Sequence, residues 1–257
     1  MNDLETYFRQ ENKRFISKWT HYFDVYDRHF SRFRNQEIVI LEIGVSEGGS
    51  LHMWRNYFGE KAKIYGVDVN PRCKELEENN VKIFIGSQSD RSFLKSLINQ
   101  IPPIDILIDD GGHTMNQQII TYNELFDHVK ENGIYLCEDL HTSYWLGYGG
   151  GHKRRGTFIE FSKNFIDYLN ANHSEQRSLR TNTFTNSVNS IHYYDSIIVI
   201  EKRKKEKSFH EKIGEMSFPP PPGKSSAQKI RLRIINGFNK RINGILRFFR
   251  LKGYSWK

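Results

Sequence analysis

Short apolar runs alternate with helix-length segments along the middle of the chain. The apolar runs lie at 38–43, 64–68, 81–85, 104–109 and 134–138. The intervening helices are expected to begin near Ser50, Pro71, Arg91 and Asn116. Two further runs, 188–193 and 196–200, are separated only by Tyr194 and Asp195, a connection so short that it permits only an antiparallel hairpin. The pattern predicts an α/β fold with a doubly wound, mostly parallel sheet and an antiparallel C-terminal hairpin.

Residues 4–33 carry aromatic side chains at helical spacing and are expected to form two helices. The stripe consists of Tyr7, Phe8, Phe15, Trp19, Tyr22, Phe23, Tyr26 and Phe30. We interpret it as a packing face. A lid or a dimer contact is the alternative, so a homo-oligomer stays open.

Composition and charge fit a cytoplasmic globular protein. Hydrophobic residues make up 37% and charged residues 26% of the chain, and no apolar run is long enough to cross a bilayer. The N-terminus lacks the layout of a signal peptide, and Cys73 and Cys137 are expected to be buried free thiols. The net charge of +8 is uneven: residues 201–257 hold 16 of the 38 basic and 4 of the 30 acidic residues, a net of +12.

The first strand runs into a glycine-rich turn with the sequence EIGVSEGGS at 42–50. Glycines in such a turn let the backbone approach a ligand closely. The residues that we expect on this side of a cofactor site are Glu42, Gly44, Ser46 and Gly48. Asp68 ends the second strand and is placed to bind a ribose diol, which both NAD and S-adenosylmethionine carry. A tight turn without a ligand is the alternative.

The loop after the third strand carries Gln88 and Asp90, which are candidates for contacts with adenine. Ser89 or Asp90 could equally cap the helix that begins near Arg91, and the two readings are compatible.

Two acidic strings follow neighbouring strands of the predicted sheet: DDGGH at 109–113 and EDLHTSYW at 138–145. Ligands of an open parallel sheet bind beyond the carboxyl ends of its strands, so these acids should converge on one crevice. Oxygen donors beside a histidine indicate a hard metal ion with a base next to it. Asp109 is expected to orient the loop on the cofactor side rather than to bind metal.

The glycine-rich turn and the two acidic strings together resemble the metal-dependent sugar O-methyltransferases, including the mycinamicin-type enzymes and the related cephalosporin hydroxylase-like proteins. The resemblance covers about residues 37–200. It implies a Rossmann-like class I methyltransferase fold that uses S-adenosylmethionine and Mg²⁺. It further implies that Asp110, Glu138 and Asp139 bind the metal and that His113 is the general base. Ser87 departs from the family, which usually has an acid at this position.

Residues after the second acidic string are candidates for the acceptor site. Tyr144 and Trp145 could stack on a sugar face or fill the core, and His141 is expected to contact substrate or solvent. The glycine-rich segment 147–155 is interpreted as a mobile substrate loop.

Beyond residue 200 lie a charged run, a proline block at 219–222 and a helical pattern. This helical pattern has one apolar face, and Lys and Arg side chains lie opposite that face or at its edges. Membrane-surface association is the favoured reading of this tail, ahead of docking on the body or a partner and of nucleic-acid binding. No motif specific for nucleic acid occurs. We expect an N-terminal helical segment at 1–36, a methyltransferase domain at 37–205, and a linker with a basic tail at 206–257.

The sequence therefore predicts an S-adenosylmethionine- and Mg²⁺-dependent O-methyltransferase acting on a sugar hydroxyl, in surface polysaccharide or in a glycosylated metabolite. An RNA-modifying methyltransferase and a non-catalytic nucleotide-binding module are the rival hypotheses.

Overall fold

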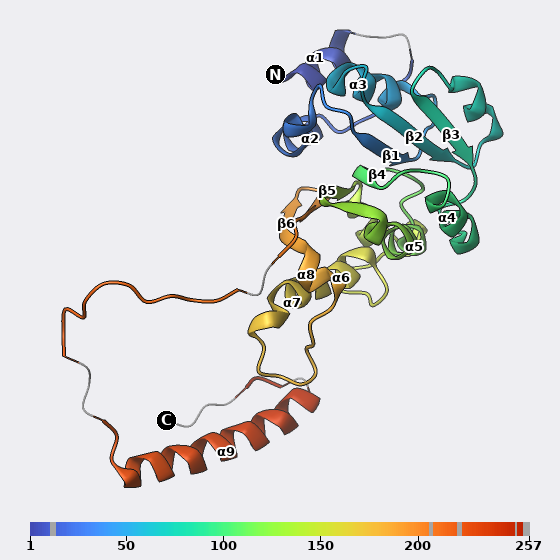
Figure 1. The fold of residues 1–257 in the computed structure, drawn as a ribbon. Helices are drawn as coiled ribbons and strands as arrows, with labels where there is room; N and C mark the ends of the chain where they lie inside the picture. The colour runs from blue at the N-terminus through green and yellow to red at the C-terminus, as the bar shows by residue number, and fades with distance from the viewer. Residues whose placement is uncertain (11–13, 206–207, 220–222, 250, 254–257) are drawn as a thin grey trace. The chain divides into compact units, whose positions relative to one another are not determined.

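A computed structural model describes residues 1–10, 14–205, 208–219, 223–249 and 251–253 (Figure 1). The chain divides into two compact units, Met1–Ser208 and Phe209–Lys257, which we describe separately. Most of the expected proline spacer, residues 220–222, lies outside the described residues, as does Arg250 at the end of the predicted tail helix.

The first unit is built on a seven-stranded sheet in the order β3-β2-β1-β4-β5-β7-β6. The strands are β1 (Val39–Ile43), β2 (Lys63–Asp68), β3 (Val81–Ile85), β4 (Ile104–Asp109), β5 (Val129–Cys137), β6 (Val188–Tyr194) and β7 (Ile197–Lys202). The first five are parallel, and β7 pairs antiparallel with both β5 and β6. This confirms the predicted fold class: a doubly wound sheet with an antiparallel C-terminal hairpin.

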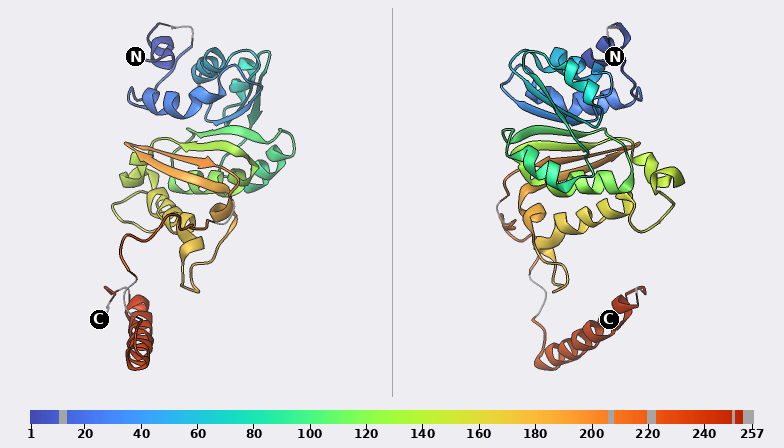
Figure 2. Two further views of the ribbon diagram at one scale, coloured as in Figure 1. Left: turned by 60° about the vertical axis from the view of Figure 1, so that its left-hand side comes forward. Right: turned by 90° about the vertical axis from the view of Figure 1, so that its right-hand side faces the viewer.

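Helices cover both faces of the sheet (Figures 1 and 2). One face packs against α1 (Asp3–Gln10), α2 (Tyr22–Phe30) and α3 (Gly49–Phe58). The other packs against α4 (Arg91–Ile98), α5 (Met115–Leu125), α6 (Phe158–Ser162), α7 (Asn164–Asn170) and α8 (Thr183–Ser187). After β2, where we expected a helix to begin near Pro71, the chain forms a 3₁₀ helix at Pro71–Leu76.

The N-terminal aromatic stripe is only partly a packing face. Tyr22, Tyr26 and Phe30 on α2 are fully buried. Phe15 and Trp19, in contrast, are 68% and 53% exposed, which corrects their assignment to that face. They lie in a non-helical segment before α2 that lines cavities at the carboxyl edge of the sheet, so their side chains face those cavities instead of the core.

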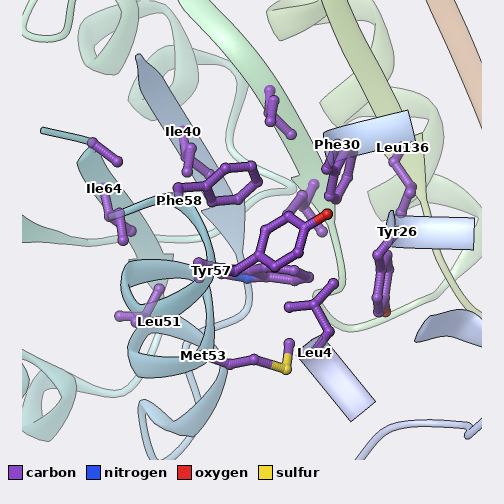
Figure 3. Close-up of a cluster of buried hydrophobic side chains, with 14 of the residues drawn as sticks. Leu4, Tyr26, Phe30, Ile40, Leu51, Met53, Tyr57, Phe58, Ile64 and Leu136 are labelled. Carbon is purple, nitrogen blue, oxygen red and sulfur yellow. The ribbon is translucent and has the colours of Figure 1, made fainter. Parts of the chain in front are cut away.

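Between the sheet and α1–α3 lies a core rich in aromatic side chains, among them Tyr26, Phe30 and Phe58 (Figure 3). Trp54 is fully buried here, and its indole N–H donates to Glu42 Oε1 at 3.1 Å. Ser50 donates to the other oxygen of Glu42 at 2.8 Å. Burial raises the pKa of Glu42 to about 7, and the nearby Lys18 ammonium only partly opposes this shift.

The second unit contains one long helix, α9 (Ser226–Phe248), which begins at a capping box formed by Ser225 and Gln228. Ile230, Ile234 and Ile245 on this helix are more than half exposed. Among the described residues, no helix has the length and apolar character needed to span a membrane.

Replacement of Glu42 should change how stability depends on pH. The folded-state pKa near 7 lies above the ordinary value of 4.5, so the folded state binds this proton more tightly than the unfolded state. The free energy of unfolding should therefore fall as the pH rises from about 4.5 to about 7. We expect Glu42→Gln to be more stable than the wild type at pH 8, by roughly 3 kcal/mol, and to lose part of this pH dependence. Chemical denaturation at several pH values measures the stability difference and the pH dependence.

Replacement of the exposed Glu60 by Gln is the control. Parallel pH profiles of the wild type and Glu42→Gln would contradict the expectation.

Candidate active site

A cavity of about 320 Å³ lies at the carboxyl ends of β1, β2 and β3. Four of the predicted cofactor residues line it: Gly44, Ser46, Asp68 and Gln88. Gly44 has φ +96°, and a Cβ there would lie 2.1 Å from the backbone oxygen of Asp110, so only glycine lets the ends of β1 and β4 approach this closely. Asp68 Oδ2 accepts from the backbone N–H groups of Val45 and Ser46, both at 2.9 Å, and thereby shapes the turn.

The structure gives the other predicted cofactor residues different roles. Glu42 is buried against Trp54 and Ser50, and Gly48 provides the left-handed residue before α3. Asp90 caps α4 by accepting from the N–H groups of the first turn. Asp109 is buried and accepts from Gln88 Nε2 at 3.0 Å, a contact that ties the ends of β3 and β4 together; burial raises the pKa of Asp109 to about 7. None of the four lines the cavity.

A second pocket brings Asp110, Glu138 and Asp139 together. They follow the adjacent strands β4 and β5, whose pairing holds the two strand ends side by side. Asp139 has a left-handed backbone (φ +55°), which turns the chain back at the strand end. Tyr22 donates its hydroxyl to Asp139 Oδ1, and Tyr26 donates to Glu138 Oε1, both at 2.7 Å.

Lys18 contributes a cation to this pocket that sequence reasoning missed. Its Nζ contacts Asp110 and lies 2.8 Å from Glu138 Oε2. Burial lowers the pKa of Lys18, but the charges of Asp110 and Glu138 outweigh it and raise that pKa above its ordinary value. Burial, together with the charge of Asp110, raises the pKa of Glu138 to about 8.

His113 lies between two of the acids. Its Nε2 is 3.4 Å from Asp139 Oδ2 and 3.8 Å from Asp110 Oδ1. Its Nδ1 is buried and has no hydrogen-bond partner among the described residues. Ligand atoms of Asp110, His113 and Asp139 all lie within 4.8 Å of one another.

The donor chemistry of this pocket fits a hard divalent cation. Carboxylate oxygens are the ligands that Mg²⁺ prefers, and Asp110 and Asp139 offer them within 4.8 Å of each other. Glu138 adds a third carboxylate, whose two oxygens accept from Tyr26 and Lys18 in this structure. Asp110 and Asp139 are each about 20% exposed, so a cation can reach them.

Aromatic rings lie beside the acidic pocket, whose wall includes Trp19. Tyr144 and Trp145 are about half exposed, so they do not fill the core. His141 lies 4.5 Å from Trp145 and 5.6 Å from Trp19 between ring centroids, and its Nδ1 is 4.0 Å from Asp139 Oδ1. Trp19 was assigned to packing from the sequence, and the structure moves it to this surface.

A signal for some of the missed residues was present in the sequence. Tyr22 and Tyr26 are four residues apart, so two hydroxyls project from the same side of an otherwise apolar helical stripe. A hydroxyl that is buried needs a hydrogen-bond partner, and here the partners are the two acids. Lys18 carried no comparable signal.

The sheet order and the site at its carboxyl edge define a Rossmann-like fold of the class I methyltransferase type. The structure of MycE methyltransferase from the Mycinamycin biosynthetic pathway, in complex with Mg, SAH and Mycinamycin VI, matches with a TM-score of 0.72 at 28% identity, over 90% of this chain and 59% of that one. A second crystal structure of MycE, with Mg and SAH, is 31% identical with a TM-score of 0.71, over 79% of this chain and 55% of that one.

Sequence relatives agree with the structural match. Demethylmacrocin O-methyltransferase of Streptomyces fradiae is 35% identical over 188 residues, 69% of this chain and 47% of the relative. A rhamnosyl tetracenomycin-C 2'-O-methyltransferase of Streptomyces olivaceus is 34% identical over 191 residues, 71% of this chain and 50% of the relative. No protein-family model matches. This homology places the chain in the sugar O-methyltransferase family that its motifs resemble. The chain spans about half the length of these curated relatives.

Proposed function

We propose that this protein transfers a methyl group from S-adenosylmethionine to a sugar hydroxyl in an Mg²⁺-dependent reaction. One observation carries the proposal: in a homologue of sugar O-methyltransferases, three carboxylates and His113 gather beside a glycine-lined cavity. MycE, to which the chain is similar, has been solved with Mg and SAH. Surface polysaccharide and glycosylated metabolites are the acceptor classes that we propose.

The two pockets adjoin each other, which suits a transfer reaction. Ser17, Lys18 and Asp110 line both the glycine-rich cavity and the acidic pocket. A methyl donor in the first and a hydroxyl in the second would therefore meet at these shared residues. Holding both reactants in this orientation would supply most of the rate enhancement.

The chain's own residues can handle the acceptor proton. Mg²⁺ held by Asp110, Glu138 and Asp139 would make a bound sugar hydroxyl more acidic. His113 Nε2 faces the same carboxylates and would accept the proton as the hydroxyl oxygen attacks the methyl carbon. The bond between that carbon and the sulfonium sulfur would break in the same step, which leaves S-adenosylhomocysteine. Asp139 and Asp110, on either side of the ring, would stabilise the imidazolium that forms.

Variants at the base and at a metal ligand test this function. We expect His113→Gln to lower kcat about 10²–10⁴-fold, the usual contribution of a positioned base. Asp110→Asn should weaken Mg²⁺ binding and abolish turnover, and a chelator should do the same reversibly. Transfer of labelled methyl groups to a panel of glycosides measures these effects, with the exposed His173→Gln as control.

The rival hypotheses give distinct outcomes in the same assay. Label that enters RNA but no glycoside would favour the RNA-modifying enzyme. Donor binding without turnover on any acceptor would favour the non-catalytic module. Turnover unaffected by chelator would contradict the metal requirement.

A third cavity supports the proposal of an acceptor larger than one sugar ring. It measures about 470 Å³, is mostly apolar, and adjoins the acidic pocket through His141, which belongs to its wall. Tyr144, Ile166 and Tyr193 give it flat and aliphatic surfaces. Such a lining suits an apolar aglycone or the apolar face of a second sugar. It suits the charged diphosphate of a sugar nucleotide poorly.

Filling this cavity should affect extended acceptors selectively. Ile166→Trp is expected to raise KM for an aryl glycoside at least tenfold, because the new side chain occupies the space for the aryl group. The methyl glycoside of the same sugar should be unaffected. Steady-state kinetics on the two acceptors measure this, with Ile166→Val as the control. An equal effect on both would show that the cavity does not bind the acceptor.

For the tail we propose association with an anionic membrane surface. Ile230, Ile234 and Ile245 on α9 are exposed, and Lys229, Arg233 and Lys240 are placed to meet lipid phosphates. An amphipathic helix of this composition buries its apolar side chains at the headgroup boundary.

Vesicle sedimentation of the full chain tests the tail proposal. The wild type should sediment with vesicles that contain phosphatidylglycerol, less so with rising salt, and weakly with pure phosphatidylcholine. Ile234→Glu with Ile245→Glu should abolish this binding, whereas Asn236→Gln should not. Binding to neither vesicle, or binding only to RNA, would overturn it.

A further inference from the structure

The non-helical segment 14–19 forms part of the wall of the glycine-rich cavity. Phe15, Ile16, Ser17 and Lys18 all line that cavity. A Cβ at Gly49 would lie 2.3 Å from both the backbone oxygen of Phe15 and Cγ1 of Ile16, so this segment lies directly on the start of α3. We call residues 14–19 the cover segment.

Two cations hold the cover segment in place. At its beginning, Arg14 Nη2 lies 2.7 Å from Glu78 Oε1, and the two side chains are 23% and 29% exposed. Near its end, Lys18 inserts among the acids, where its side chain is only 3% exposed and contacts Asp110 and Glu138. Its Nζ also lies 5.8 Å from the centre of the Tyr26 ring.

The Lys18–Glu138 pair is the more deeply buried of the two anchors. A buried charge that loses its partner is costly, and more so the less solvent reaches it. Glu138 is 1% exposed and Lys18 3%, so each needs the other.

We infer that Lys18 is a positioning residue that latches the cover segment over the methyl-donor cavity through its ion pairs with Asp110 and Glu138, so that loss of either partner of the Lys18–Glu138 pair weakens donor binding. Glu138 does not line the donor cavity, but it pairs with Lys18, which does. The inference rests on the proposed function only in taking the glycine-rich cavity as the donor site.

A double-mutant cycle in chelator, without metal or acceptor, tests the latch. Calorimetry should show that Lys18→Met and Glu138→Gln each weaken binding of S-adenosylhomocysteine roughly tenfold, as expected for the loss of a charged hydrogen bond. The double variant should bind S-adenosylhomocysteine no more weakly than the single variant with the lower affinity, because both substitutions break the same ion pair. Lys18→Arg keeps the charge and should restore most of the affinity. Glu124→Gln, a paired and mostly buried glutamate outside both pockets, is the matched control.

Amide hydrogen exchange gives an independent readout. Residues 15–19 should exchange faster in Lys18→Met and in Glu138→Gln, while the core strands β1 and β4 stay protected. Additive losses of affinity, or unchanged exchange in Glu138→Gln, would overturn the latch. If the wild type bound no S-adenosylhomocysteine, the proposed function would fail, whereas the exchange experiment would still decide the latch.

Discussion

The mutual repulsion of three carboxylates at two neighbouring strand ends is the constraint on which this site depends. Pairing of β4 with β5 places Asp110, Glu138 and Asp139 in one pocket, and Glu138 has almost no contact with solvent. Positive charge and hydrogen-bond donors must therefore be supplied locally. Lys18, Tyr22 and Tyr26 supply them from the N-terminal part of the chain.

The same constraint links the two halves of the proposed reaction. Lys18, which compensates two of the acids, belongs to the segment that also lines the glycine-rich cavity. One stretch of chain thus contributes a cation to the acidic pocket and a wall to the proposed donor site.

Most of the fold could be predicted, because each buried strand is recognisable from a short apolar run in the local sequence. Alternating apolar runs and helices placed the five parallel strands, and the two-residue connection after residue 193 dictated the hairpin. The acids were located for the same reason: parallel strands bring their carboxyl ends to one edge. The helical assignment of Phe15 and Trp19 was wrong, because aromatic spacing does not distinguish a packed helix from an irregular segment that lines a cavity.

Sequence by itself determined which groups stand at the strand ends, since strand position follows from hydrophobic periodicity. Only the tertiary structure decided where each side chain points and what it contacts. Glu42 turned inward to Trp54, and Asp90 capped a helix. Lys18 met acids that are 92 and 120 residues away along the chain. Such partnerships depend on burial and charge balance in three dimensions, which no local pattern encodes.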